Sequence, residues 1–201
     1  MARPPDPQRT AARREAIAVA AAPLFAQHGF EATTAAQIAK AAGVSSGSVF
    51  YYFEDKRAVF RAVFERDLPR SRALIERALA EPDPFAALLA IVDTIAAEAM
   101  DPIAFGLMVE LLRQIGRDEE LVSVVTDNDA LIVDGLAELI RRATDTGDVD
   151  PALDPAEAAR WIQTMIDGSF LSADPSRDPR PMLRRTVSRF LAPPAIEETD
   201  V

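Results

Sequence analysis

Two short helical patterns joined by a tight turn, within residues 33–56, constrain the fold of this chain more than any other feature of its sequence. Thr34 and Gln37 have the spacing of a capping box, which predicts a helix that begins directly after Thr34. Gly43 can adopt the conformation that stops this helix, and Ser45 can cap a second helix of similar length. The segment is therefore predicted to fold as a helix-turn-helix.

The remainder of the chain also carries helical patterns. Hydrophobic residues make up 49% of the sequence and only 8 of the 201 residues are Gly, which favours helices over a glycine-punctuated all-β fold. Apolar residues recur three and four positions apart between the Pro and Gly residues. Helices are expected over residues 9–28, from 35, from 46, through 59–64, from 84, from 102, over 118–143, over 154–175 and from 183. We therefore expect an all-α protein with about nine helices.

The sequence offers little for catalysis or metal binding. Cys is absent and His28 is the only His, which excludes a disulfide, a thiolate nucleophile and a His-rich zinc site. His28 itself falls on the apolar stripe of the first predicted helix, where we expect it to be packed in the core. A glycine-rich phosphate loop is also missing. We predict no catalytic residue, no metal and no cofactor.

Charge is distributed unevenly along the chain. The formal net charge is −10, yet residues 1–57 carry +2 and the remainder carries −12. Arginines gather at or before the start of the first predicted helix: Arg3, Arg9, Arg13 and Arg14. There they could form a flexible basic arm that follows a DNA backbone or enters the minor groove. The N-terminal region is therefore compatible with nucleic acid, although the chain as a whole is acidic.

The sequence shows no targeting or membrane segment. Residues 1–14 are rich in Pro and Arg and lack the apolar core of a signal peptide. The longest apolar stretch, residues 85–100, is interrupted by Asp93 and Glu98. We expect a cytoplasmic protein without membrane contact.

Side chains suited to DNA lie on the second helix of the helix-turn-helix. Ser45, Ser46 and Ser48 place small hydrogen-bonding groups on its first turns, the part that meets base edges in the major groove. Tyr51 and Tyr52 add large surfaces with hydroxyls that can reach phosphate. On their own these residues are equally typical of a capped, solvated helix, so the whole motif carries the prediction.

The motif resembles the DNA-binding domain of the TetR family of regulators. The similarity lies in Gly29-Phe30, Thr33-Thr34, Ile38-Ala39, the run from Ala42 to Phe53, and Lys56. More weakly, Glu110-Leu-Leu, Asp118-Glu-Glu-Leu and Asp167-Gly168 resemble the C-terminal domain of the BetI-like subgroup. The sequence departs from the pattern at Ala36 and Ser46, where basic residues are common, and at Phe50, which replaces a frequent Tyr.

The resemblance implies a ligand-responsive, sequence-specific DNA-binding regulator, more often a repressor. Such a protein is a homodimer that reads a palindromic operator in double-stranded DNA and is released by a small-molecule effector. Thr34 and Lys56 would contact phosphate, while the Ser and Tyr residues would lie at the groove. The expected domains are a helix-turn-helix domain with its basic arm (1–55), an effector-binding and dimerisation domain (56–192) and a disordered acidic tail (193–201).

Two sites are predicted in the C-terminal domain. The effector pocket is expected to be largely apolar, with Asn128 as polar anchor, although these residues could equally belong to the core and Asn128 could bond to protein or water. The pocket residues are Phe105, Met108, Leu112, Asn128, Trp161 and Met165. The helix that starts near residue 154 has two apolar faces, and the second needs a partner. The dimer interface residues are Trp161, Thr164, Gly168, Leu171 and Val187.

Two other classes of protein remain as alternatives. A small enzyme could use Asp and Glu pairs as general acid and base, and a helical interaction module could use the same fold without DNA. The helix-turn-helix distinguishes them, because neither needs a first turn of small residues flanked by Tyr and Lys.

Overall fold

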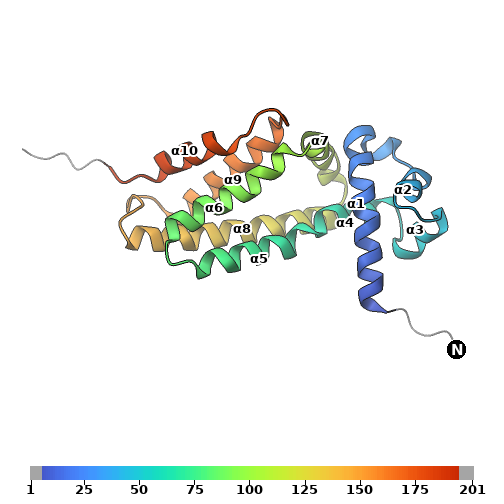
Figure 1. Cartoon of the computed structure of the whole chain (residues 1–201), viewed down its shortest axis with the longest axis horizontal. Coiled ribbons are helices and arrows are strands. Elements are labelled where there is room, and N and C mark those ends of the chain that lie inside the picture. The colour runs from blue at the N-terminus through green and yellow to red at the C-terminus, as the bar shows by residue number, and fades with distance from the viewer. Residues whose placement is uncertain (1–5, 195–201) are drawn as a thin grey trace, which may run out of the picture. The chain divides into compact units, whose positions relative to one another are not determined.

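The computed structural model describes residues 6–194, and all regular elements in that range are helical (Figure 1). The prediction of an all-α fold is confirmed. The α-helices are α1 (Pro7–Ala32), α2 (Ala35–Ala41), α3 (Ser46–Tyr52), α4 (Lys56–Glu65), α5 (Asp67–Ala80), α6 (Pro84–Ala97), α7 (Ala104–Gln114), α8 (Glu119–Asp145), α9 (Pro155–Leu171) and α10 (Arg180–Leu191). Short 3-10 turns follow α6 at Glu98–Met100 and α7 at Ile115–Arg117. The single long helix expected around residues 59–64 is divided into α4 and α5 at Arg66.

Helix starts follow the capping residues in the sequence. Asp83 and Asp154 precede α6 and α9, and each carboxylate accepts a hydrogen bond from the backbone N–H three residues later, at 2.9 and 2.8 Å. In both helices Pro occupies the first turn, where its missing N–H costs nothing. Within residues 6–194, no helix has both the length and the hydropathy that crossing a bilayer requires.

Gly29 ends the regular part of α1, as predicted. Its φ of 77° and ψ of 166° interrupt the helix, and a side chain at this position would be strained. Thr33, fully buried, follows the interruption and donates its hydroxyl to the carbonyl oxygen of Gly29 at 2.8 Å. The neighbouring His28 is exposed. The expectation of a core histidine was wrong, because the imidazole of His28 points into solvent from the end of the regular part of α1.

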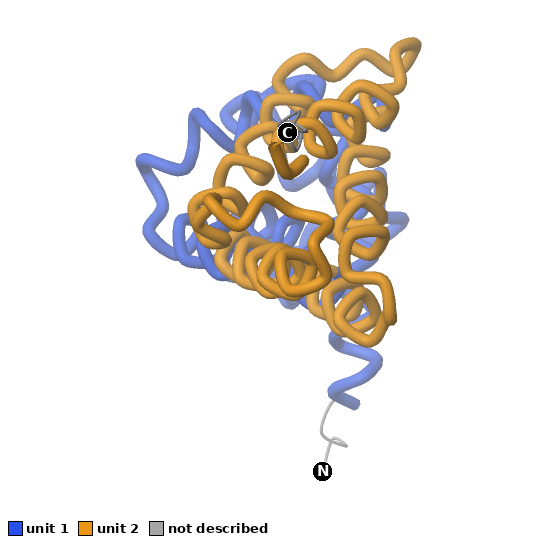
Figure 2. The backbone as a smooth tube through the Cα atoms, turned by 90° about the vertical axis from the view of Figure 1, so that its left-hand side faces the viewer, with its two compact units in different colours: residues 1–70, 101–128 blue, residues 71–100, 129–201 orange. Residues whose placement is uncertain are grey.

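The chain forms two compact units, each made of two stretches of sequence (Figure 2). Unit 1 comprises residues 1–70 and 101–128, so α4 and α7 belong to the same compact unit as the helix-turn-helix, and both pack against α1. Unit 2 comprises residues 71–100 and 129–201. The boundary expected after residue 55 does not coincide with the division into these two units, and the assignment of functions to either side of it stays a prediction. Most of the predicted acidic tail lies outside the described residues.

Aromatic rings form the centre of unit 1. Phe60 on α4 packs edge-on against Phe25 and Phe30 of α1, with ring centroids 5.0 and 5.6 Å apart, and against Phe64 at 5.2 Å. Gly106 lets α7 approach α1 closely, since a Cβ there would lie 2.4 Å from the carbonyl oxygen of Ala26. This core fixes the frame on which α2 and α3 rest.

Unit 2 has a mainly aliphatic core. Its fully buried residues come from α6, α8, α9 and α10: Leu88, Ile91, Val92, Leu136, Leu139, Ile140, Ile162, Ile166, Val187 and Leu191. Gly135 brings α8 against α5, because a Cβ there would lie 2.6 Å from a methyl carbon of Ile75. The result is a helical bundle held by branched aliphatic side chains.

Candidate nucleic-acid interface

Local hydrogen bonds build the connection between α2 and α3. The Thr34 hydroxyl accepts from the backbone N–H of Gln37 at 3.2 Å, and the Gln37 side chain accepts from the backbone N–H of Thr34 at 2.8 Å. Gly43 turns the chain with a φ of 66°. The Ser45 hydroxyl then accepts from the backbone N–H of Ser48 at 3.1 Å and caps α3. The predicted helix-turn-helix is confirmed.

Helix α3 has one buried and one exposed face. Val49 and Phe53, the residue after the helix, are buried in the core of unit 1. Phe50 and Tyr51 leave 56% and 68% of their surfaces exposed. We call the exposed residues of α3 and its cap the outer face of α3; they are Ser45, Ser46, Gly47, Phe50 and Tyr51.

The outer face of α3 has the chemistry of a groove reader. Serine hydroxyls can donate to or accept from any base edge, and an apolar ring can pack against the methyl group of thymine. Phe50 supplies such a ring and was missing from the predicted site. Its position four residues after Ser46, hence on the same side of the helix, is the signal that could have found it.

Two of the predicted contact residues are less accessible. Ser48 is half-buried, and its hydroxyl lies 2.8 Å from that of Ser45. Tyr52 is half-buried, and its ring lies edge-on to that of Tyr51 with centroids 5.0 Å apart. Both adjoin the outer face of α3 and stay candidates for DNA contact.

Lys56 lies in a different setting from the one that the resemblance implies. Its Nζ donates to the carbonyl oxygens of Phe30, Glu31 and Thr33 at 2.7, 3.1 and 2.9 Å. It also stands 4.4 Å from the centre of the Phe30 ring. An ammonium group has three donors, so these bonds occupy all of them. We therefore leave Lys56 out of the proposed phosphate contacts.

The predicted arginine arm is helical where the structure describes it. Asp6 caps α1, which begins at Pro7, so Arg9 and Arg13 are exposed on a regular helix. Arg14, also on α1, donates to the carbonyl oxygen of Tyr52 at 2.6 Å. These three residues therefore belong to the helix that was predicted to begin near residue 9. Arg3, the remaining arginine of the predicted arm, lies outside the described residues.

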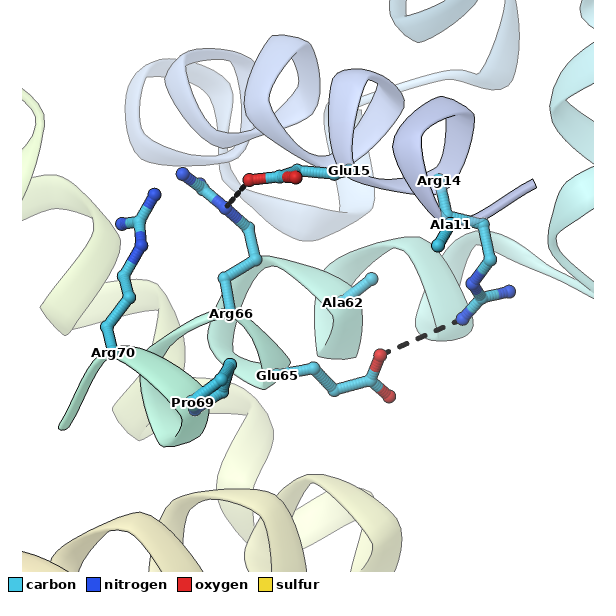
Figure 3. Close-up of a pocket in the computed structure, with 8 residues that line it drawn as sticks. All are labelled: Ala11, Arg14, Glu15, Ala62, Glu65, Arg66, Pro69 and Arg70. Carbon is cyan, nitrogen blue, oxygen red and sulfur yellow. Dashed lines mark ion pairs between the residues drawn. The ribbon is translucent and has the colours of Figure 1, made fainter. Parts of the chain in front are cut away.

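A hollow of about 380 Å³ lies on unit 1 between α1 and the junction of α4 with α5 (Figure 3). Figure 3 shows two ion pairs on its walls: Arg14 with Glu65 at 3.7 Å, and Arg66 with Glu15 at 3.8 Å. These pairs join α1 to the C-terminal end of α4. Paired charges make this hollow unlike the apolar effector pocket predicted from the sequence.

The predicted effector residues fall in both units. In unit 1, Phe105 and Leu112 expose about half of their surfaces, whereas Asn128 has a buried Oδ1 without a hydrogen-bond partner. In unit 2, Trp161 is exposed and Met165 is half-buried against the core. Of the predicted pocket residues in unit 1, Asn128 is the one whose buried polar atom lacks a hydrogen-bond partner.

Helix α9 has the two faces that the sequence predicts. Its inner face, with Ala158 and Ile162, is buried in unit 2. Its outer face is exposed and comprises Trp161, Thr164, Gly168 and Leu171. Val187 is fully buried in the core of unit 2 and has no surface to offer a partner. On the same helix, α10, Met182 is 66% exposed and was missed.

Asp167 on α9 bonds to the buried Gln163 and lies close enough to Asp129 for their charges to interact. The side-chain amide of Gln163 donates to Asp167 at 3.0 Å. Burial and, after it, the negative charge of Asp129 on α8 raise the pKa of Asp167 to about 6, although the hydrogen bond from Gln163 opposes the shift. Burial also raises the pKa of Asp129. The folded chain therefore holds Asp167 less readily in its charged form than the unfolded chain does.

Comparison with known proteins agrees with this geometry. Residues 17–63 match the family model of bacterial regulatory proteins of the tetR family, and residues 84–193 match that of the C-terminal domain of BetI-type transcriptional repressors. The HTH-type transcriptional repressor Rv1474c of Mycobacterium tuberculosis is 26% identical over 180 residues, which cover 85% of this chain and 87% of the relative.

Solved structures share the fold. FadR of Bacillus subtilis, in complex with stearoyl-CoA, superposes with a TM-score of 0.73 at 22% identity, over 88% of this chain and 96% of that one. AibR, in complex with isovaleryl coenzyme A and operator DNA, gives 0.71 at 20% identity, over 90% and 99%. With both family models matched, this chain belongs to the tetR family of DNA-binding transcriptional regulators, with a C-terminal domain of the BetI type.

Proposed function

We propose that this protein is a repressor whose outer face of α3 reads the major groove of a palindromic operator. The exposure of Phe50 and Tyr51 on a short, capped helix is the observation that carries the proposal. Two large aromatic rings on the surface expose apolar area to water, which is unfavourable unless a partner covers it. Thr34, Arg9 and Arg13 are exposed on the same unit and supply phosphate contacts.

A palindromic operator has two equivalent half-sites, so a second copy of the chain is proposed to bind the second one. The outer face of α9 presents Trp161 and Leu171 to solvent, with 59% and 48% of their surfaces exposed. Gly168 has no atom within 4 Å of where a Cβ would stand, so another helix can approach it closely. Met182 on α10 is another exposed apolar side chain of unit 2, and it takes the place of the buried Val187 in the proposed interface. A two-fold axis lets one such patch serve both protomers.

A small molecule is proposed to release the repressor from DNA. The structures of FadR with stearoyl-CoA and AibR with isovaleryl coenzyme A show that proteins of this fold accept such ligands. In this chain the buried Oδ1 of Asn128 offers an unpartnered acceptor, at a cost of about 1–3 kcal/mol that a ligand donor would remove. The expected effector therefore has an apolar body and a hydrogen-bond donor.

Fluorescence anisotropy with operator and scrambled duplexes tests the DNA-reading face. Tyr51→Ala and Ser48→Ala should lower operator affinity roughly tenfold, about 1–3 kcal/mol for each lost base contact, and leave affinity for scrambled DNA nearly unchanged. Phe105→Ala removes a ring that is 50% exposed from α7 of the same unit and serves as the control. Equal losses on both duplexes would contradict reading by α3.

The dimer and the effector have separate tests. Sedimentation equilibrium at micromolar concentration should show a dimer that Trp161→Glu dissociates; a wild-type monomer would contradict the proposal.

Asn128→Leu should still bind operator but respond weakly to an effector found by thermal-shift screening. A normal response of this variant would show that Asn128 is not the anchor.

A further inference from the structure

The two ends of the α2–α3 segment are held by side chains from α4 and α1. The segment after Gly29 leads into α2, and its carbonyl oxygens receive three bonds from Lys56. At the other end, the carbonyl oxygen of Tyr52 in the last turn of α3 receives a bond from Arg14. We call these two groups of contacts the entry clasp, made by Lys56, and the exit clasp, made by Arg14.

The entry clasp lies in the segment that follows the interruption of α1. Gly29 has non-helical backbone angles, and the carbonyl oxygens of Phe30, Glu31 and Thr33 come after it. Hydrogen bonds from a charged ammonium group to these oxygens are stronger than bonds between neutral groups. Lys56 is the first residue of α4, so its three bonds tie the start of α4 to the chain just before the α2 cap.

The exit clasp combines three kinds of contact in one guanidinium group. Arg14 donates from Nη1 to the Tyr52 carbonyl oxygen at 2.6 Å and lies 4.3 Å above the ring of the buried Phe53. Its Nη2 is 3.7 Å from the carboxylate of Glu65 on α4. The guanidinium has several N–H groups, so it can bond to a carbonyl oxygen and a carboxylate while it lies over an aromatic ring. The C-terminal end of α3 is therefore fixed to both α1 and α4.

A helix of seven residues needs such support. Isolated helices of this length are not stable in water, so tertiary contacts set the position and angle of α3. Val49 anchors its middle in the core of unit 1, while the clasps hold the backbone at either end of the α2–α3 segment. A change in either clasp would tilt the outer face of α3 without removing any of its side chains.

We propose that Lys56 and Arg14 are positioning residues for operator recognition, which act through the backbone of the DNA-reading segment rather than by binding phosphate. The proposal rests on the operator reading by α3 proposed above. It assigns specificity to two cations that face inward, and it predicts that neither contributes to the salt dependence of binding. Each neutralised phosphate adds about 0.9 to the slope of log affinity against log salt concentration, so the two roles are separable.

The test measures affinity for operator and scrambled duplexes across salt concentrations in the full-length protein, at a temperature where every variant is folded by circular dichroism. Lys56→Met and Arg14→Met should lose roughly tenfold or more in operator affinity while the salt slope stays as in the wild type. The matched controls Lys40→Met and Arg13→Met replace exposed cations on α2 and α1. Arg13→Met should lower the slope by about 0.9 with little change in discrimination.

Conservative variants keep the test decisive if a Met variant does not fold. Lys56→Arg retains the positive charge. The planar guanidinium, however, cannot direct its N–H groups at the same three carbonyl oxygens as the Lys56 ammonium does. Positioning predicts that Lys56→Arg discriminates less well than the wild type at an unchanged slope. A phosphate contact predicts full discrimination by Lys56→Arg and a slope lowered by about 0.9 in Lys56→Met.

The possible failures differ in their readout. If the clasp variants discriminate as well as the wild type, the positioning role is overturned and the DNA-reading role of α3 stands. If the wild type itself binds both duplexes equally, the proposed function is overturned and the positioning role with it.

Discussion

Unit 1 and unit 2 bury their cores with different side chains, and the difference matches what each must specify. In unit 1, Phe60 contacts three other rings edge-on, an arrangement with preferred angles and distances. In unit 2 the fully buried residues are aliphatic, and such cores tolerate repacking when volume is conserved. Side-chain geometry is therefore fixed most narrowly in the unit that carries the short helix α3.

The largest effect is expected from the aromatic core. Phe60→Ala should destabilise the protein by about 3–5 kcal/mol in urea unfolding, because it removes a fully buried ring and leaves a cavity. Conservative substitutions, one in each unit, compare the two cores more directly. Phe60→Leu loses three ring contacts worth about 0.5–1.5 kcal/mol each, whereas Ile140→Leu in unit 2 should cost less than about 1.5 kcal/mol. Equal costs for these two changes would remove the contrast between the cores.

Glycines in the two units should respond in opposite ways. Gly106→Ala places a Cβ 2.4 Å from the carbonyl oxygen of Ala26, so thermal unfolding should show a loss of about 1–3 kcal/mol. Gly168→Ala meets no atom within 4 Å in its own unit. It should gain up to about 1 kcal/mol in monomer stability from helix propensity, while its dimer dissociates more readily in sedimentation. A tighter Gly168→Ala dimer would argue against close helix approach on the outer face of α9.

A smaller effect is expected from the raised pKa of Asp167. The folded chain holds this proton up to about pH 6 and the unfolded chain only to about its ordinary pKa of 3.8. The folded state binds more protons between these values, so this contribution to stability is present at low pH and is lost as pH rises through 6. Asp167→Asn should raise the unfolding temperature at pH 8 but not at pH 4. Because the side chain keeps exposed surface, we expect less than about 1 kcal/mol.

Asp174 provides a control of opposite sign in the same unit. Two hydrogen bonds from Ser176 lower the pKa of its carboxyl group. Its stabilising contribution is therefore present above the ordinary pKa and is lost as pH falls. Asp174→Asn should lower the unfolding temperature slightly at pH 8. If both Asn variants shift in the same direction, charge is not the cause.

Local signals made the helix-turn-helix predictable. The capping box at Thr34, the positive φ of Gly43 and the cap at Ser45 each involve residues within four positions, which a sequence displays directly. The clasps could not be found in this way. Lys56 reaches carbonyls 23 to 26 residues away and Arg14 one 38 residues away, so only the folded chain brings them together.

Periodicity predicted faces but not which neighbours cover them. Both faces of α9 were recognised from spacing, and the structure buries one and exposes the other. Val187 belongs to an equally good apolar pattern on α10, yet it is fully buried while Met182 is exposed. The side of an amphipathic helix that meets the core depends on the packing of other helices, which one helix's pattern does not contain.

Selection of sequences from a random duplex pool tests the central claim most directly. The purified full-length wild type should enrich a single pseudo-palindrome with half-sites about one helical turn apart, roughly 10 base pairs between centres. Tyr51→Ala, selected in parallel, should enrich the same sequence weakly or recover a degenerate one, because the lost side chain lies on the outer face of α3. Enrichment of no sequence by the wild type, or of an identical motif with equal strength by Tyr51→Ala, would contradict the account.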